Sequence, residues 1–136
     1  MATQQKIRYS DCDAQAIVFN ANYPRYWDDA LTDWLEEAGF GGTELGGIGA
    51  DLVTARTEID YKASAGLGDV LETNLVVEKF GNTSMTVGVG TRRLSDGQLV
   101  ASGRQVLVFI DPRTHTPIPV PDRVRDVLSG ESGVIA

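Results

Sequence analysis

The sequence predicts an α+β fold in which one five-stranded antiparallel sheet wraps around one long helix. A strand-like N-terminal segment precedes a single amphipathic helix, and four strand-like segments separated by turn signals follow it. Packing the helix on the sheet buries the apolar sides of both. The 136 residues contain no internal repeat and no long linker. Residues 1–136 are therefore expected to form one domain, with a core of about 4–110 and a Pro-rich tail of 111–136.

The first strand is predicted over Gln4–Ser10, where apolar residues alternate loosely before a cluster of turn-forming residues. A helix of about four turns is predicted from Tyr23, because apolar residues then recur at intervals of three and four. These apolar positions are Tyr23, Trp27, Leu31, Trp34, Leu35 and Ala38. Asn20 and Asn22 are candidate N-terminal caps. Pro24 suits a first turn, and Gly39 suits the position just after a helix.

The segment after the helix, Gly39–Ala50, holds six glycines and is expected to be a flexible connection. Four strands then follow, at residues 51–63, 69–80, 83–94 and 98–110. Val106–Ile110 is apolar at every position, which predicts a central strand covered on both faces. A short helix is predicted over Asp122–Leu128. Because one helix cannot cover both sides of the sheet and free edges invite pairing, we expect copies of the chain to associate through the sheet, with two-fold symmetry.

The composition narrows the classes of partner. The formal net charge is −7, with 19 acidic and 12 basic residues, which argues against nucleic acid because phosphate binding needs a basic face. The single cysteine, Cys12, excludes an intrachain disulfide and fits a reducing cytoplasm. No apolar run approaches the roughly 20 residues of a membrane span, and the N-terminus lacks the apolar core of a signal peptide. We therefore expect a soluble cytoplasmic protein.

Most familiar catalytic arrangements are missing from the sequence. The only histidine, His115, lies in the Pro-rich tail, so no Ser-His-Asp triad is visible and a turn or surface position is expected for it. One histidine and one cysteine cannot supply the ligands of a zinc site, and no metal is expected. Cys12 stands between two aspartates, which disfavour a thiolate, so it is interpreted as a small packing residue. The glycines of 39–49 lack the closing Lys-Ser/Thr of a phosphate loop.

The remaining candidate is Asp11-Cys12-Asp13, followed by Ile17-Val18-Phe19 and then the predicted helix. Such an aspartate pair usually forms only a solvated turn. Here it stands just before a helix N-terminus and beside apolar residues, which places a carboxylate base near backbone N–H donors. Those are the groups needed to hydrolyse an activated acyl group.

These residues and their neighbours resemble the signature of the 4-hydroxybenzoyl-CoA thioesterase family. The matching residues of the first block are Tyr9-Ser10-Asp11-Cys12-Asp13, Ile17-Val18-Phe19-Asn20, Tyr23 and Arg25-Tyr26-Trp27-Asp28. Later matches are Ile59-Asp60-Tyr61, Gly68-Asp69 and Thr83-Ser84, so the similarity covers roughly residues 4–110. The resemblance implies the hotdog fold and a homodimer or homotetramer with active sites at the subunit interface.

The resemblance also implies an activity, the hydrolysis of an acyl-CoA to a free carboxylic acid and CoA, with no cofactor besides the CoA of the substrate. Asp13 takes the catalytic position, as a general base or a nucleophile, and Asp11 a structural one. The backbone N–H of Asn20 takes the position of the oxyanion donor, helped by the partial positive charge of the helix start. Predicted substrate-binding residues are Phe19, Tyr23, Trp27 and Asp28.

Two departures from the family pattern affect the expected site. Ala16 stands where the family commonly has glycine, so its methyl group is expected to narrow or shift the site. The basic turn that some relatives carry before Thr83 is absent, which leaves other basic residues as candidates for the CoA phosphates. These candidates are Lys62, Lys79, Arg92 and Arg93. Two alternatives stay open: a non-catalytic protein that binds acyl-CoA or another metabolite, and a hotdog hydratase or dehydratase, which usually pairs its carboxylate with a histidine.

Overall fold

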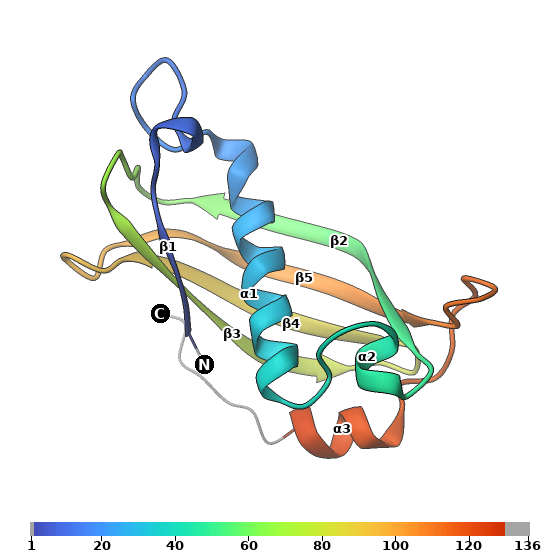
Figure 1. Ribbon diagram of the computed structural model, residues 1–136. Coiled ribbons are helices and arrows are strands. Elements are labelled where there is room, and N and C mark those ends of the chain that lie inside the picture. Colours follow the sequence, from blue (N-terminus) through green and yellow to red (C-terminus); the bar gives the residue numbers. More distant parts are fainter. Residues whose placement is uncertain (1, 130–136) are drawn as a thin grey trace.

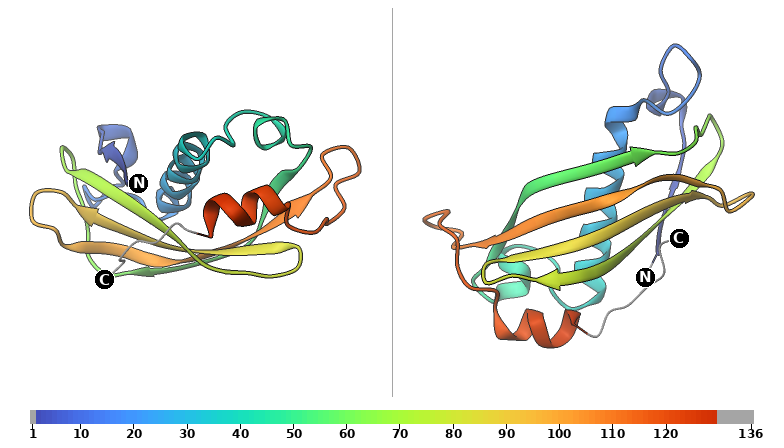
Figure 2. Two further views of the ribbon diagram at one scale, coloured as in Figure 1. Left: turned by 90° about the horizontal axis from the view of Figure 1, so that it is seen from below. Right: turned by 180° about the vertical axis from the view of Figure 1, so that it is seen from behind.

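A computed structural model describes residues 2–129 as a five-stranded antiparallel sheet that curls around one helix (Figure 1; Figure 2). The strands lie in the order β1-β3-β4-β5-β2. Their bounds are Ala2–Lys6 (β1), Asp51–Tyr61 (β2), Val70–Phe80 (β3), Ser84–Arg93 (β4) and Leu99–Ile110 (β5). Helix α1 (Tyr23–Glu37) crosses one face of this sheet. The predicted α+β architecture is confirmed, and the four later strands begin and end within two residues of their predicted bounds.

The apolar side of α1 is packed against the sheet, as its spacing predicts. Its buried side chains are Tyr23, Tyr26, Trp27, Ala30 and Trp34. The Nε1 of Trp27 donates a 3.0 Å hydrogen bond to the Oγ1 of Thr91 on β4. That hydroxyl in turn lies 2.9 Å from the Oγ1 of Thr73 on β3. These bonds satisfy polar atoms inside an otherwise apolar layer and fix the position of the helix on the sheet.

The start of α1 is held differently from the prediction. Asn22 stands at the N-cap position, but its Nδ2 donates to the backbone oxygen of Asp11 at 2.8 Å instead of capping the helix. Asn20 opens a single 3-10 turn, η2 (Asn20–Asn22), that runs directly into α1. The predicted side-chain caps are therefore wrong, because η2 extends the helix and moves its unpaired N–H groups to Asn20. Pro24 in the first turn and Gly39 after the last are confirmed.

The first strand is shorter than predicted. β1 ends at Lys6, and Tyr9–Asp11 form a 3-10 turn, η1, where the sequence predicts continued strand. The backbone N–H of Arg8 donates to the Oδ2 of Asp11 at 2.8 Å, and the N–H of Asp11 donates back to the Arg8 oxygen at 3.0 Å. This pair of bonds turns the chain over the end of the sheet and towards α1.

The glycine-rich connection is structured, so its prediction as a flexible segment is wrong. It contains a short helix, α2 (Glu44–Gly47), and buries Phe40 and Leu45 in the core. Five of its six glycines have positive φ angles. Glycine is present here because this path needs left-handed backbone conformations, which other residues adopt at a cost.

The C-terminal tail also belongs to the core as far as it is described. Helix α3 (Asp122–Leu128) is confirmed, and it buries Val124 and Leu128. The guanidinium of Arg125 donates to the Gly81 oxygen at 2.6 Å and lies over the ring of Phe80. The tail therefore closes one end of the helix-sheet layer, and the core extends beyond the predicted limit of residue 110. Residues 130–136 of the predicted tail lie outside the described residues.

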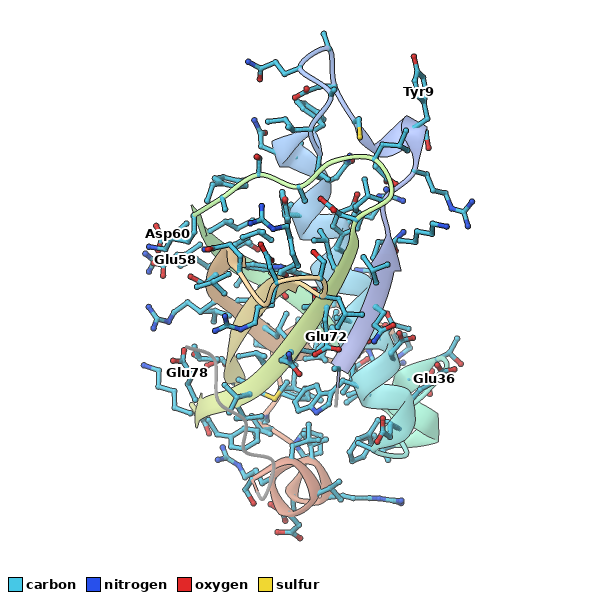
Figure 3. The ribbon with its side chains drawn as sticks, turned by 90° about the vertical axis from the view of Figure 1, so that its left-hand side faces the viewer. Tyr9, Glu36, Glu58, Asp60, Glu72 and Glu78 are labelled. Atoms are coloured by element: carbon cyan, nitrogen blue, oxygen red, sulfur yellow. The ribbon has the colours of Figure 1, made fainter. Side chains whose placement is uncertain are left out.

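The face of the sheet away from α1 is uncovered by residues 2–129 (Figure 2). β5 is an internal strand, as predicted, but Val106 and Val108 on this outer face are only partly buried, so coverage on both faces is not found within the chain. Glu58, Asp60 and Glu78 project from the same side (Figure 3). An arginine, Arg104, lies between two of these acids, 2.9 Å from Glu78 and 3.5 Å from Glu58.

Candidate active site

A tight hairpin closed by the Cys12–Val18 bridge lies above the start of α1 (Figure 1), and Asp13 is part of this hairpin. Its N–H donates to the Ile17 oxygen at 2.9 Å, and the Ala16 N–H donates to the Asp13 oxygen at 3.0 Å. The Oδ1 of Asp13 accepts a hydrogen bond from the Gln15 N–H at 2.8 Å. The hairpin is tied to the loop after β2, because the Val18 N–H donates to the Ala65 oxygen at 2.8 Å. Local turn chemistry thus fixes the direction of the carboxylate.

Ala16 occupies the turn in a left-handed conformation, with a φ of 62°. A residue with a Cβ adopts this conformation at a cost of roughly 1–2 kcal/mol, whereas glycine does so freely. The backbone at position 16 would therefore suit glycine better than the alanine that is present. This reason is separate from the predicted effect of the Ala16 methyl group on the site. That predicted effect stays a prediction.

Asp11 is buried and anchors the hairpin to α1. Its Oδ1 accepts a 2.9 Å hydrogen bond from Arg25, and its backbone oxygen accepts one of 2.9 Å from the Phe19 N–H. Burial acts to raise the pKa of Asp11, but the hydrogen bond from the Arg8 N–H and the charge and hydrogen bond of Arg25 hold that pKa below its ordinary value. Asp11 is therefore an ionised structural group, in agreement with the role that the resemblance implies.

The carboxylate of Asp13 lies on the wall of an open depression of about 450 Å³. The other lining residues are Tyr9, Cys12, Ala14, Ala16 and Leu67. Tyr9 is 85% exposed and Leu67 is 64% exposed, and Figure 3 shows Tyr9 projecting from the end of the molecule. Cys12 is partly buried against the core, as its interpretation as a packing residue predicts. A carboxylate flanked by solvent-exposed apolar side chains is suited to an apolar ligand or a partner surface.

Asn20 lies on a second depression, of about 410 Å³. It is lined by Ile17, Val18, Asn20, Tyr23, Tyr61, Lys62, Ala63 and Ser64. Among the hydrogen bonds within residues 2–129, none uses the Asn20 N–H as its donor. This N–H begins the continuous stretch of η2 and α1, where helix dipoles favour a negative ligand. Asp13 and Asn20 thus line neighbouring depressions and do not share one pocket within a single chain.

The predicted substrate-binding residues are placed unequally. Phe19 is 48% exposed beside Asn20, and Tyr23, although buried, reaches the wall of the Asn20 depression. Trp27 is 0% exposed, because it packs beneath α1 with its N–H held by Thr91, so we exclude it from the acyl-binding set. The other three stay predictions.

Asp28 lies on an exposed part of α1, but one side of its carboxylate is packed towards β5. This partial burial, with the neighbouring charge of Asp29, raises the pKa of Asp28 above its ordinary value. The buried amide of Gln105 on β5 acts to lower the pKa of Asp28. The Nε2 of the same amide lies 3.5 Å from the Oγ1 of Thr57 on β2. Asp28, Gln105 and Thr57 thus form a small polar cluster on the helix-facing side of the sheet.

The predicted CoA-binding residues lie in three different places. Lys62 lines the Asn20 depression. Arg93 is near it but is engaged, since it donates to the Ser64 oxygen at 2.7 Å and pairs with Asp96 at 2.8 Å. Arg92 donates to the Gly97 oxygen at 2.9 Å in the turn after β4. Lys79 lies at the opposite end of β3 from the Asp13 hairpin of the same chain, and its role as a phosphate ligand stays a prediction.

Three residues near the site carried no predicted role. Tyr61 belongs to the Ile59-Asp60-Tyr61 match, and its hydroxyl donates to the Asn20 oxygen at 3.1 Å. Gln105 follows Arg104 and directly precedes the apolar run Val106–Ile110, and nothing in the sequence says which neighbour its amide meets. Nothing in the sequence indicates a role for Leu67 beyond its place in a turn. The position of each residue near the site follows only from the fold, which brings β2, β5 and the hairpin to the same end of α1.

Two further structural findings concern metals and membranes. Within residues 2–129, no group of three His, Cys, Asp or Glu side chains is gathered closely enough to hold a metal ion. His115 is an exposed turn residue with a φ of 59°, as predicted. In the same part of the chain, no helix is long and apolar enough to cross a membrane.

Comparison with known proteins identifies similar chains. The profile of the thioesterase-like superfamily matches residues 7–128. The acyl-CoA thioester hydrolase YbgC of Escherichia coli O6:H1 is 26% identical over 121 residues, which are 88% of this chain and 88% of that protein. Slr0204, a 1,4-dihydroxy-2-naphthoyl-CoA thioesterase from Synechocystis, has a TM-score of 0.84 and 18% identity over 95% of each chain. SAV2348 of Staphylococcus aureus, solved in complex with CoA, has a TM-score of 0.85 and 16% identity over 99% of this chain and 87% of that one. These structures confirm the hotdog fold.

Proposed function

This chain belongs to the thioesterase-like superfamily, and from that membership we propose that it hydrolyses an acyl-CoA to a free carboxylic acid and CoA. The observation that carries the proposal is the pairing of two groups on one hairpin. The Asp13 carboxylate is fixed at its tip, and the Asn20 N–H, which has no acceptor within residues 2–129, is fixed at its base. A thioester needs both a base or nucleophile and a donor for the oxyanion.

The proposed reaction requires one thioester carbonyl to reach both groups, from the Asn20 depression to the neighbouring Asp13 depression. The thioester oxygen accepts a hydrogen bond from the Asn20 N–H, which the start of η2 and α1 makes partly positive. Asp13 then takes a proton from water as the water oxygen adds to the carbonyl carbon. The tetrahedral intermediate collapses, the C–S bond breaks, and the CoA thiolate takes up the proton. In the nucleophilic route, Asp13 attacks the carbon itself, CoA leaves, and water opens the mixed anhydride.

A second copy of the chain completes the site in this proposal. β2 is an edge strand of 11 residues, and both depressions are open to solvent. Pairing of two β2 edges would extend the sheet and satisfy their outward backbone groups, which is a common outcome for a long free edge. We therefore propose a homodimer, or a homotetramer built from it, in which the partner covers the exposed apolar side chains beside Asp13.

The polar cluster on α1 and the sheet supports a substrate preference. Asp28, Gln105 and Thr57 supply a carboxylate, an amide and a hydroxyl on the surface that faces the helix. We propose that they bind a polar group on the acyl chain, because the carboxylate and the hydroxyl keep hydrogen-bonding capacity that a purely hydrocarbon acyl group could not use. Lys62, on the Asn20 depression, is the proposed contact for the CoA phosphates, whereas Arg93 holds the neighbouring loop.

One screen tests the proposal and its rivals. Thiol release from short, long and aromatic acyl-CoAs, each with and without a hydroxyl group, is followed with a chromogenic thiol reagent. We expect release from at least one class, with hydroxylated members preferred. Tight binding of every acyl-CoA without thiol release would replace the proposal by a non-catalytic binding protein. Water addition to an enoyl-CoA without thiol release would indicate a hydratase.

A further inference from the structure

Tyr61, the last residue of β2, links that edge strand to the turn that precedes α1. Its hydroxyl donates to the Asn20 oxygen at 3.1 Å, and the same oxygen accepts the N–H of Tyr23. The ring of Tyr61 meets the ring of Tyr23 edge-on, with centroids 5.7 Å apart. Tyr23 meets Tyr26 in the same way at 5.8 Å. Three aromatic rings therefore run from the end of β2 to the first turns of α1, beside the turn that contains Asn20.

The turn η2 cannot hold its own geometry strongly. It is a single 3-10 turn of three residues, closed by the 2.9 Å bond from the Asn22 N–H to the Phe19 oxygen. Bonds of this type have poorer geometry than those of an α-helix, and the turn lies at the N-terminal end of α1, where the first N–H groups have no partner within the helix. The direction of the Asn20 N–H therefore depends on contacts made from outside the turn.

Two outside contacts hold the turn, one on each side of Asn20. Before it, the Phe19 N–H is bound to the buried Asp11. After it, the Asn20 carbonyl is bound by the Tyr61 hydroxyl. The hydroxyl proton of Tyr61 is directed at Asn20, so Tyr61 acts on Asn20 even though its side chain is 52% exposed and lines the same depression.

We propose that Tyr61 is a positioning residue. Its hydroxyl holds the Asn20–Ala21 peptide and, through the Cα of Asn20, restrains the adjoining Phe19–Asn20 peptide so that the Asn20 N–H stays directed at the oxyanion. The inference rests on the proposed function. Tyr61 does not itself touch the reacting atoms, and its loss affects the chemical step more than substrate binding. An oxyanion donor contributes only while it is held in place before the charge develops.

The test is Tyr61→Phe, which removes the hydroxyl and keeps the ring. We expect kcat to fall about five- to tenfold while KM changes less than twofold, because a hydrogen bond that orients the oxyanion donor acts in the transition state. The exchange rate of the Tyr23 amide proton, measured by NMR, should rise in the same variant, since that amide closes the loosened turn. Thr32→Ala is the matched control. It also removes a hydroxyl that donates to a backbone oxygen, at 2.9 Å on the exposed side of α1, and should change neither quantity.

The outcomes separate this inference from the proposed function. If the wild-type chain releases thiol and Tyr61→Phe keeps the wild-type kcat, the inference is overturned and the thioesterase stands. A rise in KM alone would also overturn it, because Tyr61 would then be a substrate contact. If the wild-type chain releases no thiol, the proposed function fails. The exchange rate of Tyr23 then still decides whether the hydroxyl holds the turn, and an unchanged rate overturns that claim.

Discussion

The two ends of α1 are built in opposite ways. At its N-terminal end, Tyr9 and Leu67 stand largely in solvent and the Asn20 N–H has no acceptor within residues 2–129. At its C-terminal end, α2 and α3 lie beside the helix (Figure 1), and Phe40 of the glycine-rich connection and Leu128 of α3 are buried almost completely. The C-terminal end of α1 is therefore part of the closed core. The N-terminal end leaves apolar side chains exposed and an N–H donor without an acceptor in the described residues.

This difference indicates that the closed end contributes mainly to stability and the open end mainly to function. Closing the C-terminal end buries apolar side chains, which is the main favourable contribution to folding. The open end keeps groups that a substrate or a second copy can satisfy, at the cost of less burial. Changes at the open end should therefore alter turnover more than stability, and changes at the closed end should do the reverse.

The largest expected effect at the open end is that of Asp13→Asn. It should lower kcat by about a hundredfold or more, because the amide neither accepts the proton of water nor attacks the carbonyl. The thermal midpoint should stay within a few degrees, since Asn can still accept the Gln15 N–H. Asp126→Asn on the exposed side of α3 is the control. Wild-type turnover in the Asp13 variant would remove Asp13 from the reaction.

At the closed end, Leu128→Ala should cost at least about 2 kcal/mol of unfolding free energy, because it empties a fully buried site. The urea midpoint measures this loss. Val127→Ala, on the exposed side of the same helix, should have a much smaller effect. The folded Leu128→Ala protein should keep its kcat at low temperature. A large fall in kcat without a loss of stability would contradict the division between the two ends.

The buried carboxylate of Asp11, which anchors the hairpin at the open end, should make the stability of the protein depend on pH. The folded pKa of Asp11 is lowered below its unfolded value of about 3.9, so the group adds stability above that value and loses it as pH falls through the folded pKa. Asp11→Asn should therefore be less stable than wild type by about 1–2 kcal/mol at pH 7. Urea unfolding at pH 7 and pH 2.5 should show this gap shrinking in acid. A gap of equal size at both pH values would mean that the charge of Asp11 contributes nothing.

The smallest effect concerns the turn that carries Asp13. Ala16→Gly should stabilise the protein by about 0.5–1 kcal/mol, because relief of the left-handed conformation exceeds the added entropy of the unfolded chain. Ala14→Gly, in the same turn but without a positive φ, should destabilise it slightly. Thermal unfolding of both variants checks the sign. Equal shifts in the two variants would show that Ala16 is not strained.

The sequence predicted the elements better than it predicted the site. Alternation and helical spacing located α1 and the four later strands to within two residues, because those patterns follow from burying one side of each element. It misjudged Gly39–Ala50, since composition cannot distinguish a glycine that adds flexibility from one that adopts a positive φ. It also misjudged Trp27, because spacing along a chain does not say which residues face a ligand.

The residues themselves therefore determined the α+β order, the position of the Asp11-Cys12-Asp13 turn before a helix, and the family resemblance. Only the tertiary structure decided that Asp11 is the buried anchor, that Asp13 and Asn20 line separate depressions, and that Tyr61 reaches Asn20 from a strand 41 residues away in sequence. The reason is physical. Local patterns record which side of each element is buried, whereas a site is a meeting of distant segments whose contacts exist only once the sheet has closed around the helix.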